Sequence, residues 1–113
     1  MLGEWRGSIK TYQGDLAAKL SIRNGRNIVL EIDGKKTRPM RVRNPLGRVR
    51  FRDGVFQAPF FGSIPTDDCK RSQHVLFLRL RRRGDTLSGV AAAVAMNQTF
   101  WLPHWMELKK VPE

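Results

Sequence analysis

Short segments of alternating hydrophobic and polar residues run through the whole chain, and this period of two limits its fold more than any other feature. Every second residue from Leu16 to Ile22 is apolar, whereas Lys19 and Ser21 lie between them. Successive side chains of a β-strand point to opposite faces, so such a segment buries one face and exposes the other. The sequence therefore predicts β-strands.

Tight-turn residues separate these segments. Asn24-Gly25, Asp33-Gly34 and Asp53-Gly54 are pairs that suit the backbone of a hairpin. We predict strands over 5–12, 16–23, 28–32, 39–43, 48–52, 55–61, 74–83, 86–96 and 98–111, with one long loop over 62–73. The alanine-rich segment 86–96 also suits a short helix by propensity, but its length, its Gly89 and its neighbouring turns favour a strand.

Eight or nine short strands joined by tight turns predict an all-β fold, an antiparallel up-and-down meander. Closing such a sheet into a small barrel buries its edges, and a two-sheet sandwich is the alternative. The 113 residues suit a single domain over 1–113. No apolar run approaches the roughly 20 residues of a membrane-spanning helix. If an export signal has been removed, we expect a periplasmic or secreted protein, and otherwise a cytoplasmic one.

Positive charge is the second strong feature, because 21 Lys and Arg residues against 10 Asp and Glu give a formal net charge of +11. Eight arginines share the outward parity of neighbouring predicted strands and should form one basic face: Arg41, Arg43, Arg48, Arg50, Arg52, Arg79, Arg81 and Arg83. Such a face attracts nucleic acid or another anionic surface. It also keeps strands from sticking together. Phe77 and Phe56 are the aromatics here that could stack on bases.

Several ordered motifs carry a family resemblance. They are Gly3-Glu4-Trp5 with Gly7, then PMRV, VRF, Phe61-Gly62, GDTLSG and a closing LPHWMELKK. Over nearly its full length the chain resembles the lipocalin-like (calycin) β-barrel domains attached to bacterial serine hydrolases. The resemblance implies that Trp5 plugs one end of the barrel beneath a basic side chain of the last strand, Lys109 or Lys110. It also implies an accessory role beside a hydrolase domain.

Small residues on one face of segment 86–96 leave open whether the barrel encloses a cavity. The residues expected to line its lumen are Trp5, Phe51, Gly89, Ala91, Ala93, Phe100 and His104. An apolar hollow with few polar groups is typical of small-molecule sites. The alternative is that Trp5 and the phenylalanines fill the space. A hydrogen-bonded structural role is the alternative for His104.

Two tryptophans, Trp101 and Trp105, share the outward parity of the last strand and predict an interface with a partner domain, a twin subunit or the long loop. We expect no catalytic residues and no cofactor. Ser88 lacks the strand-to-helix elbow of a nucleophile. The residues Asp67, Asp68, Cys69 and His74 match no zinc or calcium spacing, so no metal site is expected.

These observations predict a noncatalytic domain that binds a small apolar ligand or docks a partner, in association with a bacterial hydrolase. The alternative is a domain that binds nucleic acid or an anionic surface through the arginine face. Co-purified apolar molecules would favour the first function, and salt-sensitive binding of DNA would favour the second.

Overall fold

A computed structural model of the chain describes residues 2–11, 14–24, 27–40, 49–61, 74–95 and 101–112, and these residues form nine strands and no helix. The strands are β1 (Gly3–Thr11), β2 (Gly14–Asn24), β3 (Asn27–Ile32), β4 (Lys35–Thr37), β5 (Arg50–Arg52), β6 (Val55–Phe61), β7 (His74–Arg83), β8 (Thr86–Ala95) and β9 (Trp101–Lys110). The all-β prediction is confirmed, and the alanine-rich segment is a strand.

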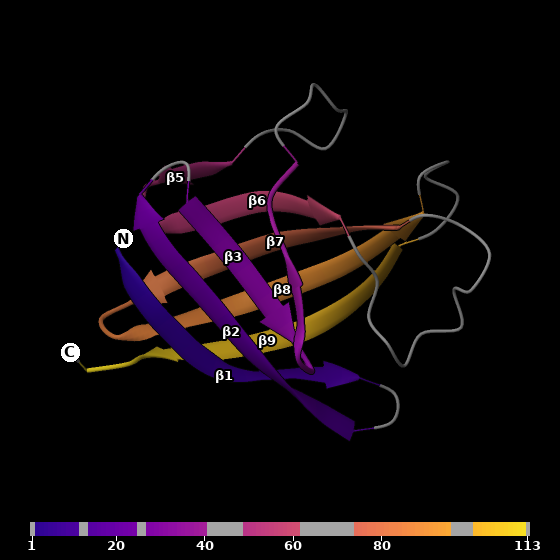
Figure 1. The fold of residues 1–113 in the computed structure, drawn as a ribbon, viewed down its shortest axis with the longest axis horizontal. Coiled ribbons are helices and arrows are strands. Elements are labelled where there is room, and N and C mark those ends of the chain that lie inside the picture. Colours follow the sequence, from indigo (N-terminus) through magenta and orange to yellow (C-terminus); the bar gives the residue numbers. More distant parts are fainter. Residues whose placement is uncertain are drawn as a thin grey trace.

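All nine strands belong to one antiparallel sheet in the order β4-β3-β2-β1-β9-β8-β7-β6-β5. Every neighbouring pair except β1 and β9 is consecutive in the chain, so the predicted up-and-down meander is confirmed. The pairing of β1 with β9 joins the first and last strands in the middle of the sheet. Figure 1 shows the sheet folding over itself, with β2 and β3 crossing in front of β7 and β8.

The two ends of the sheet approach each other through the segment that follows β4. Pro39 forms an isolated bridge with Phe60 of β6, and the Met40 N–H donates to the Pro59 carbonyl oxygen at 2.8 Å. The Thr37 hydroxyl donates to the Phe61 carbonyl oxygen. Beyond these contacts, no ladder of hydrogen bonds closes the sheet among the described residues. The result is a strongly curved sheet joined at one point.

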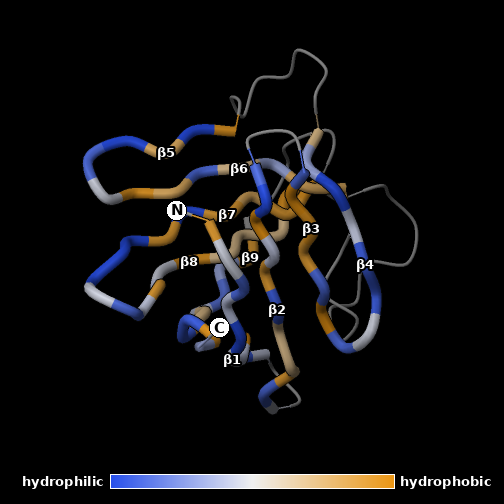
Figure 2. The backbone as a smooth tube through the Cα atoms, turned by 60° about the vertical axis from the view of Figure 1, so that its left-hand side comes forward, coloured by the Kyte–Doolittle hydropathy of each residue, from blue (hydrophilic) through white to orange (hydrophobic). Residues whose placement is uncertain are grey.

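The inner face of the curved sheet carries the hydrophobic core. Inward-facing residues from β1, β2, β3, β6, β7, β8 and β9 form one buried cluster, and the largest of its fully buried side chains are Trp5, Phe56, Phe60, Ile9, Leu20, Leu30, Leu76, Leu78, Leu80, Leu87 and Met106. Alternation of the two hydropathy colours along β2 and β5 is visible in Figure 2. The period of two in the sequence thus corresponds to the two faces of the sheet.

One strand of the structure lies outside the predicted segments. It is β4 (Lys35–Thr37), which follows the Asp33-Gly34 turn and pairs with β3, whereas the predicted strand over 39–43 begins after it. The segment Lys35–Thr37 contains no apolar residue, so hydrophobic alternation does not reveal it. Residues 41–48 lie outside the described part of the chain, and with them the predicted basic-face residues Arg41, Arg43 and Arg48.

Candidate functional site

Trp5 lies at one end of the inner face, beneath two cations. Its side chain is fully buried, with the Arg82 guanidinium 5.4 Å and the Lys110 ammonium 6.0 Å from the ring centroid. At these distances a cation is attracted by the ring electrons. The contact with Lys110 matches what the resemblance implied for the last strand. Sequence reasoning missed Arg82, although its inward parity, two residues after Leu80, was a signal.

The indole nitrogen of Trp5 lacks a hydrogen bond among the described residues. This atom, Nε1, is buried. Arg82 is held by a hydrogen bond from its Nε to the Gly84 carbonyl oxygen at 3.0 Å. The two cations therefore form a polar cover over an apolar ring, and the hydrogen bond restrains Arg82 in this position.

Of the predicted lumen residues, Ala91 and Ala93 face inward and are fully buried within the core cluster. Gly89 requires a correction. It is only half-buried, and a Cβ built on it would lie 2.1 Å from the Arg79 carbonyl oxygen of β7. The backbone of the neighbouring strand, rather than open lumen, occupies the space that a side chain would take.

Phe51 also departs from its predicted lumen position, because its side chain is 46% exposed. It has the inward parity expected for it, but β5 is the terminal strand of the sheet and pairs with β6 over three residues only. Its inner side therefore lacks a covering neighbour. Phe100 lies outside the described residues.

His104 of β9 is buried and hydrogen-bonded. Its Nδ1 lies 2.9 Å from the Lys10 carbonyl oxygen. A carbonyl oxygen only accepts, so Nδ1 carries the proton and donates. The β1–β9 ladder ends at Ile9 and Met106, and the imidazole continues this connection beyond the ladder. This contact supports the structural alternative for His104.

The arginines of β5 and β7 lie in register across β6. Arg50 is paired with Gln57 and Gln57 with Arg79, while Arg52 is paired with Val55 and Val55 with Arg81. Registered side chains share a face, and two strand spacings place each arginine pair about 10 Å apart. With Arg83, these exposed residues form what we term the arginine face: Arg50, Arg52, Arg79, Arg81 and Arg83.

Little negative charge balances the arginine face. Arg52 contacts Asp53 at 3.8 Å, and both side chains are largely exposed, so this pair is weak. Among the described residues, no ion pair is formed by Arg50, Arg79, Arg81 or Arg83. One further cation, Lys109, extends the surface, because Arg83 is paired with Thr86 and Thr86 with Lys109.

An exposed tryptophan lies on the same outer face. Trp105 of β9 is paired with Val90, and Val90 with Arg79, so Trp105 continues the row that contains Arg50 and Arg79. Trp105 is 45% exposed, and its Nε1 donates to Glu107 Oε1 at 3.3 Å. Trp101 lies at the start of β9, paired with Val94. Of the phenylalanines considered for stacking, Phe56 is buried and Phe77 is half-buried.

Toward the other end of β7 and β8, the outer face becomes apolar and buried. Val75, Ala92 and Val94 have outward parity, yet their exposed fractions are 3%, 6% and 1%. The sequence alternation predicts exposure for these positions. Trp105 and Val90 thus lie between this buried apolar area and the arginines.

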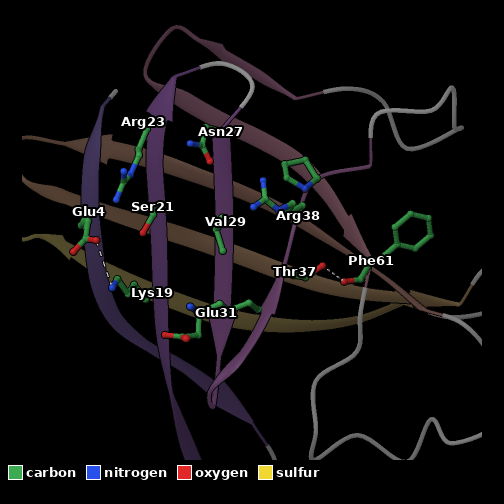
Figure 3. A pocket seen from close by; sticks show the side chains of 12 residues that line it. Glu4, Lys19, Ser21, Arg23, Asn27, Val29, Glu31, Thr37, Arg38 and Phe61 are labelled. Carbon is green, nitrogen blue, oxygen red and sulfur yellow. Dashed lines mark hydrogen bonds and ion pairs between the residues drawn. The ribbon is translucent and has the colours of Figure 1, made fainter.

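A groove of about 670 Å³ lies on the outer face of β2 and β3, beside the segment after β4 (Figure 3). Its charged lining consists of Lys19, Arg23, Lys36, Arg38, Glu4 and Glu31. Lys19 already pairs with Glu4 at 3.5 Å. Figure 3 shows Arg23 directed toward β1 and Arg38 toward β3. Because side chains of both signs line it, the groove does not favour one class of ligand.

No group of three or more possible metal ligands occurs among the described residues. Asp67, Asp68 and Cys69 lie outside them, and His74 begins β7. Ser88 lies in β8, in register with Arg81 and Glu107. Within the described part of the chain, no helix has the length and apolar character needed to cross a membrane.

Comparison of the chain with protein-family models, curated proteins and solved structures found no match.

Proposed function

We propose that this protein is a noncatalytic binding domain whose arginine face binds a polyanion. The observation that carries the proposal is the registered pairing of Arg50 with Arg79 and of Arg52 with Arg81 across β6. Together with Arg83, these five exposed arginines occupy two strands, β5 and β7, of one convex face. Such a density of cations with little acidic compensation favours phosphate-rich or carboxylate-rich partners.

A small apolar ligand inside the sheet is the second candidate function. The buried Trp5 Nε1, which lacks a hydrogen-bond partner among the described residues, favours it, because a ligand oxygen could accept that proton. The inward side chains pack into one continuous cluster, and for this reason we place the surface function first.

An accessory role in a lipocalin-like domain attached to a bacterial hydrolase is compatible with either function. The position of Lys110 over Trp5 supports that assignment. A polyanion-binding face would then direct the attached enzyme to an anionic surface.

The test uses inorganic polyphosphate, which offers charge without bases or lipid chains. The triple variant Arg50→Glu, Arg79→Glu, Arg81→Glu lowers the formal charge by six, from +11 to +5. We expect its affinity for end-labelled polyphosphate, measured by fluorescence anisotropy, to fall by about tenfold or more, since phosphate contacts dominate such binding.

The matched control is Arg23→Glu, Lys35→Glu, Lys36→Glu, which makes the same charge change at three exposed positions of β2 and β4, strands that carry no residue of the arginine face. We expect this control to retain most of the affinity. Equal losses in the two triple variants would mean that net charge, rather than the arginine face, governs binding. Absence of binding by the unmodified protein at low salt would overturn the proposal.

A further inference from the structure

The outer face of β5–β9 carries polar, apolar and aromatic side chains as well as arginines. One registered row runs from Arg50 through Gln57, Arg79 and Val90 to Trp105. Two strand spacings separate Arg79 from Trp105, or about 10 Å. Polar, cationic, apolar and aromatic groups thus follow one another across a single face.

The Trp105 side chain is held at the surface rather than packed into the core. Its ring is 45% exposed, and Val90 beside it is 38% exposed. The hydrogen bond from Nε1 to Glu107 restrains the indole from one edge. An indole ring that is oriented and open on the outside is a surface on which a planar group can stack.

Charge is distributed unevenly along this face. Five arginines lie on β5 and β7, whereas β9 carries the Glu107 carboxylate beside Trp105 and one exposed cation, Lys109. A phosphate backbone is therefore attracted most strongly to the β5–β7 side. A neutral aromatic base, in contrast, is accommodated beside the indole and Val90. The face therefore distinguishes a charged backbone from an uncharged planar substituent.

From this arrangement we infer that the polyanion is a single-stranded nucleic acid, with phosphates on the arginine face and a base stacked on Trp105; this inference rests on the proposed polyanion-binding function. Proteins that bind single strands without sequence preference combine a cationic track with aromatic platforms. Gln57, between Arg50 and Arg79, adds a neutral hydrogen-bonding group to the track.

The decisive comparison is between a labelled oligodeoxythymidylate and an abasic oligonucleotide of the same length. The two probes have the same phosphodiester backbone, so only the bases differ. For Trp105→Ala we expect the affinity for oligodeoxythymidylate to fall by roughly five- to 100-fold, because one base loses its stacking partner. Affinity for the abasic probe should be unchanged. Trp105→Phe keeps an aromatic ring and should restore much of the binding.

Salt dependence provides a second measurement on the same probes. If all five arginines contact phosphates, the logarithm of the binding constant should fall with the logarithm of salt concentration with a slope of about −3.5. The Arg50→Glu, Arg79→Glu, Arg81→Glu variant should have a slope nearer zero, whereas Trp105→Ala should retain the original slope. Circular dichroism of each variant checks that the sheet is intact.

Each outcome separates this inference from the proposal on which it rests. Equal affinity for the two oligonucleotides, or no effect of Trp105→Ala, would overturn the nucleic-acid assignment, while polyphosphate binding would still support the general function. Trp105-dependent binding to phosphatidylglycerol vesicles that exceeds binding to the oligonucleotide would assign the face to a membrane surface instead. Failure to bind polyphosphate and both oligonucleotides would overturn both proposals.

Discussion

At the scale of single residues, Trp5 is the largest fully buried side chain among the described residues, and its surroundings are unusual. Its ring is fully buried near the start of β1, and two cations from β7 and β9 lie over it. Burial of so large an apolar side chain is strongly stabilising, and the cations add attraction to the ring electrons. Because Arg82 and Lys110 come from different strands, Trp5 links β1 to both β7 and β9.

Trp5→Ala should therefore lower the free energy of unfolding by about 3–5 kcal/mol, as large aromatic truncations in a core typically do. Urea denaturation followed by far-UV circular dichroism measures the change. The matched control is Trp105→Ala, which removes the same side chain from an exposed position and should cost far less. Similar midpoints for the two variants would contradict the role of Trp5 in closing the core.

At the scale of elements, the sequence predicts strands well where apolar and polar residues alternate and poorly where a strand is wholly polar. The alternation in 16–23 and 74–83 identified β2 and β7, because both contribute a full row of inward side chains. The short strand β4 has the polar sequence Lys35–Thr37 and pairs only with β3. Charged edge strands are common because they resist aggregation, but they have no hydrophobic period to detect.

In the candidate site, the local sequence pattern predicts the face on which a side chain lies. Its exposure, in contrast, depends on the arrangement of the whole sheet. Outward parity grouped Arg50 with Arg79, and the sheet places both on one face. It also assigned Trp105 to the outer side of the last strand, but only the register of the sheet joins Trp105 to the arginines. Parity alone cannot tell that Phe51 lies on a terminal strand and is exposed. It also cannot tell that Val94, on an outward position, is buried. Both facts depend on which neighbours cover a strand.

Close packing between β1 and β9 provides a test at this scale. A Cβ added to Gly7 would lie 1.8 Å from the Glu107 carbonyl oxygen. Gly7→Ala must therefore separate the two strands, and we expect it to lower the free energy of unfolding by about 1–3 kcal/mol or more, the usual range for overpacking. Ser8→Ala, at the next position of β1, is the control and should have little effect. Equal stability of Gly7→Ala and Ser8→Ala in urea denaturation would show that the strands are less tightly packed here.

At the scale of the whole molecule, the central question is whether the curved sheet encloses a filled core or a cavity. Ala91 and Ala93 are fully buried in the same cluster as the large side chains of the facing strands. Small residues there allow the bulky side chains opposite to pack closely, rather than leaving a hollow. On this interpretation the surface of the molecule, and not its interior, carries the binding function.

The double variant Ala91→Leu, Ala93→Leu tests this interpretation, because it adds bulk to the interior and leaves the arginine face unchanged. In a filled core each leucine should cost about 1–3 kcal/mol of stability through overpacking, while binding of polyphosphate by the remaining folded protein should persist. Ala17→Leu is the matched control: it makes the same substitution at an exposed position of β2 and should change stability by no more than about 0.5 kcal/mol. Nile red, a neutral apolar dye, reports on a cavity. Strong dye binding by the unmodified protein that is lost in a fully stable double variant would show a hollow interior and would favour the small-ligand function over the surface one.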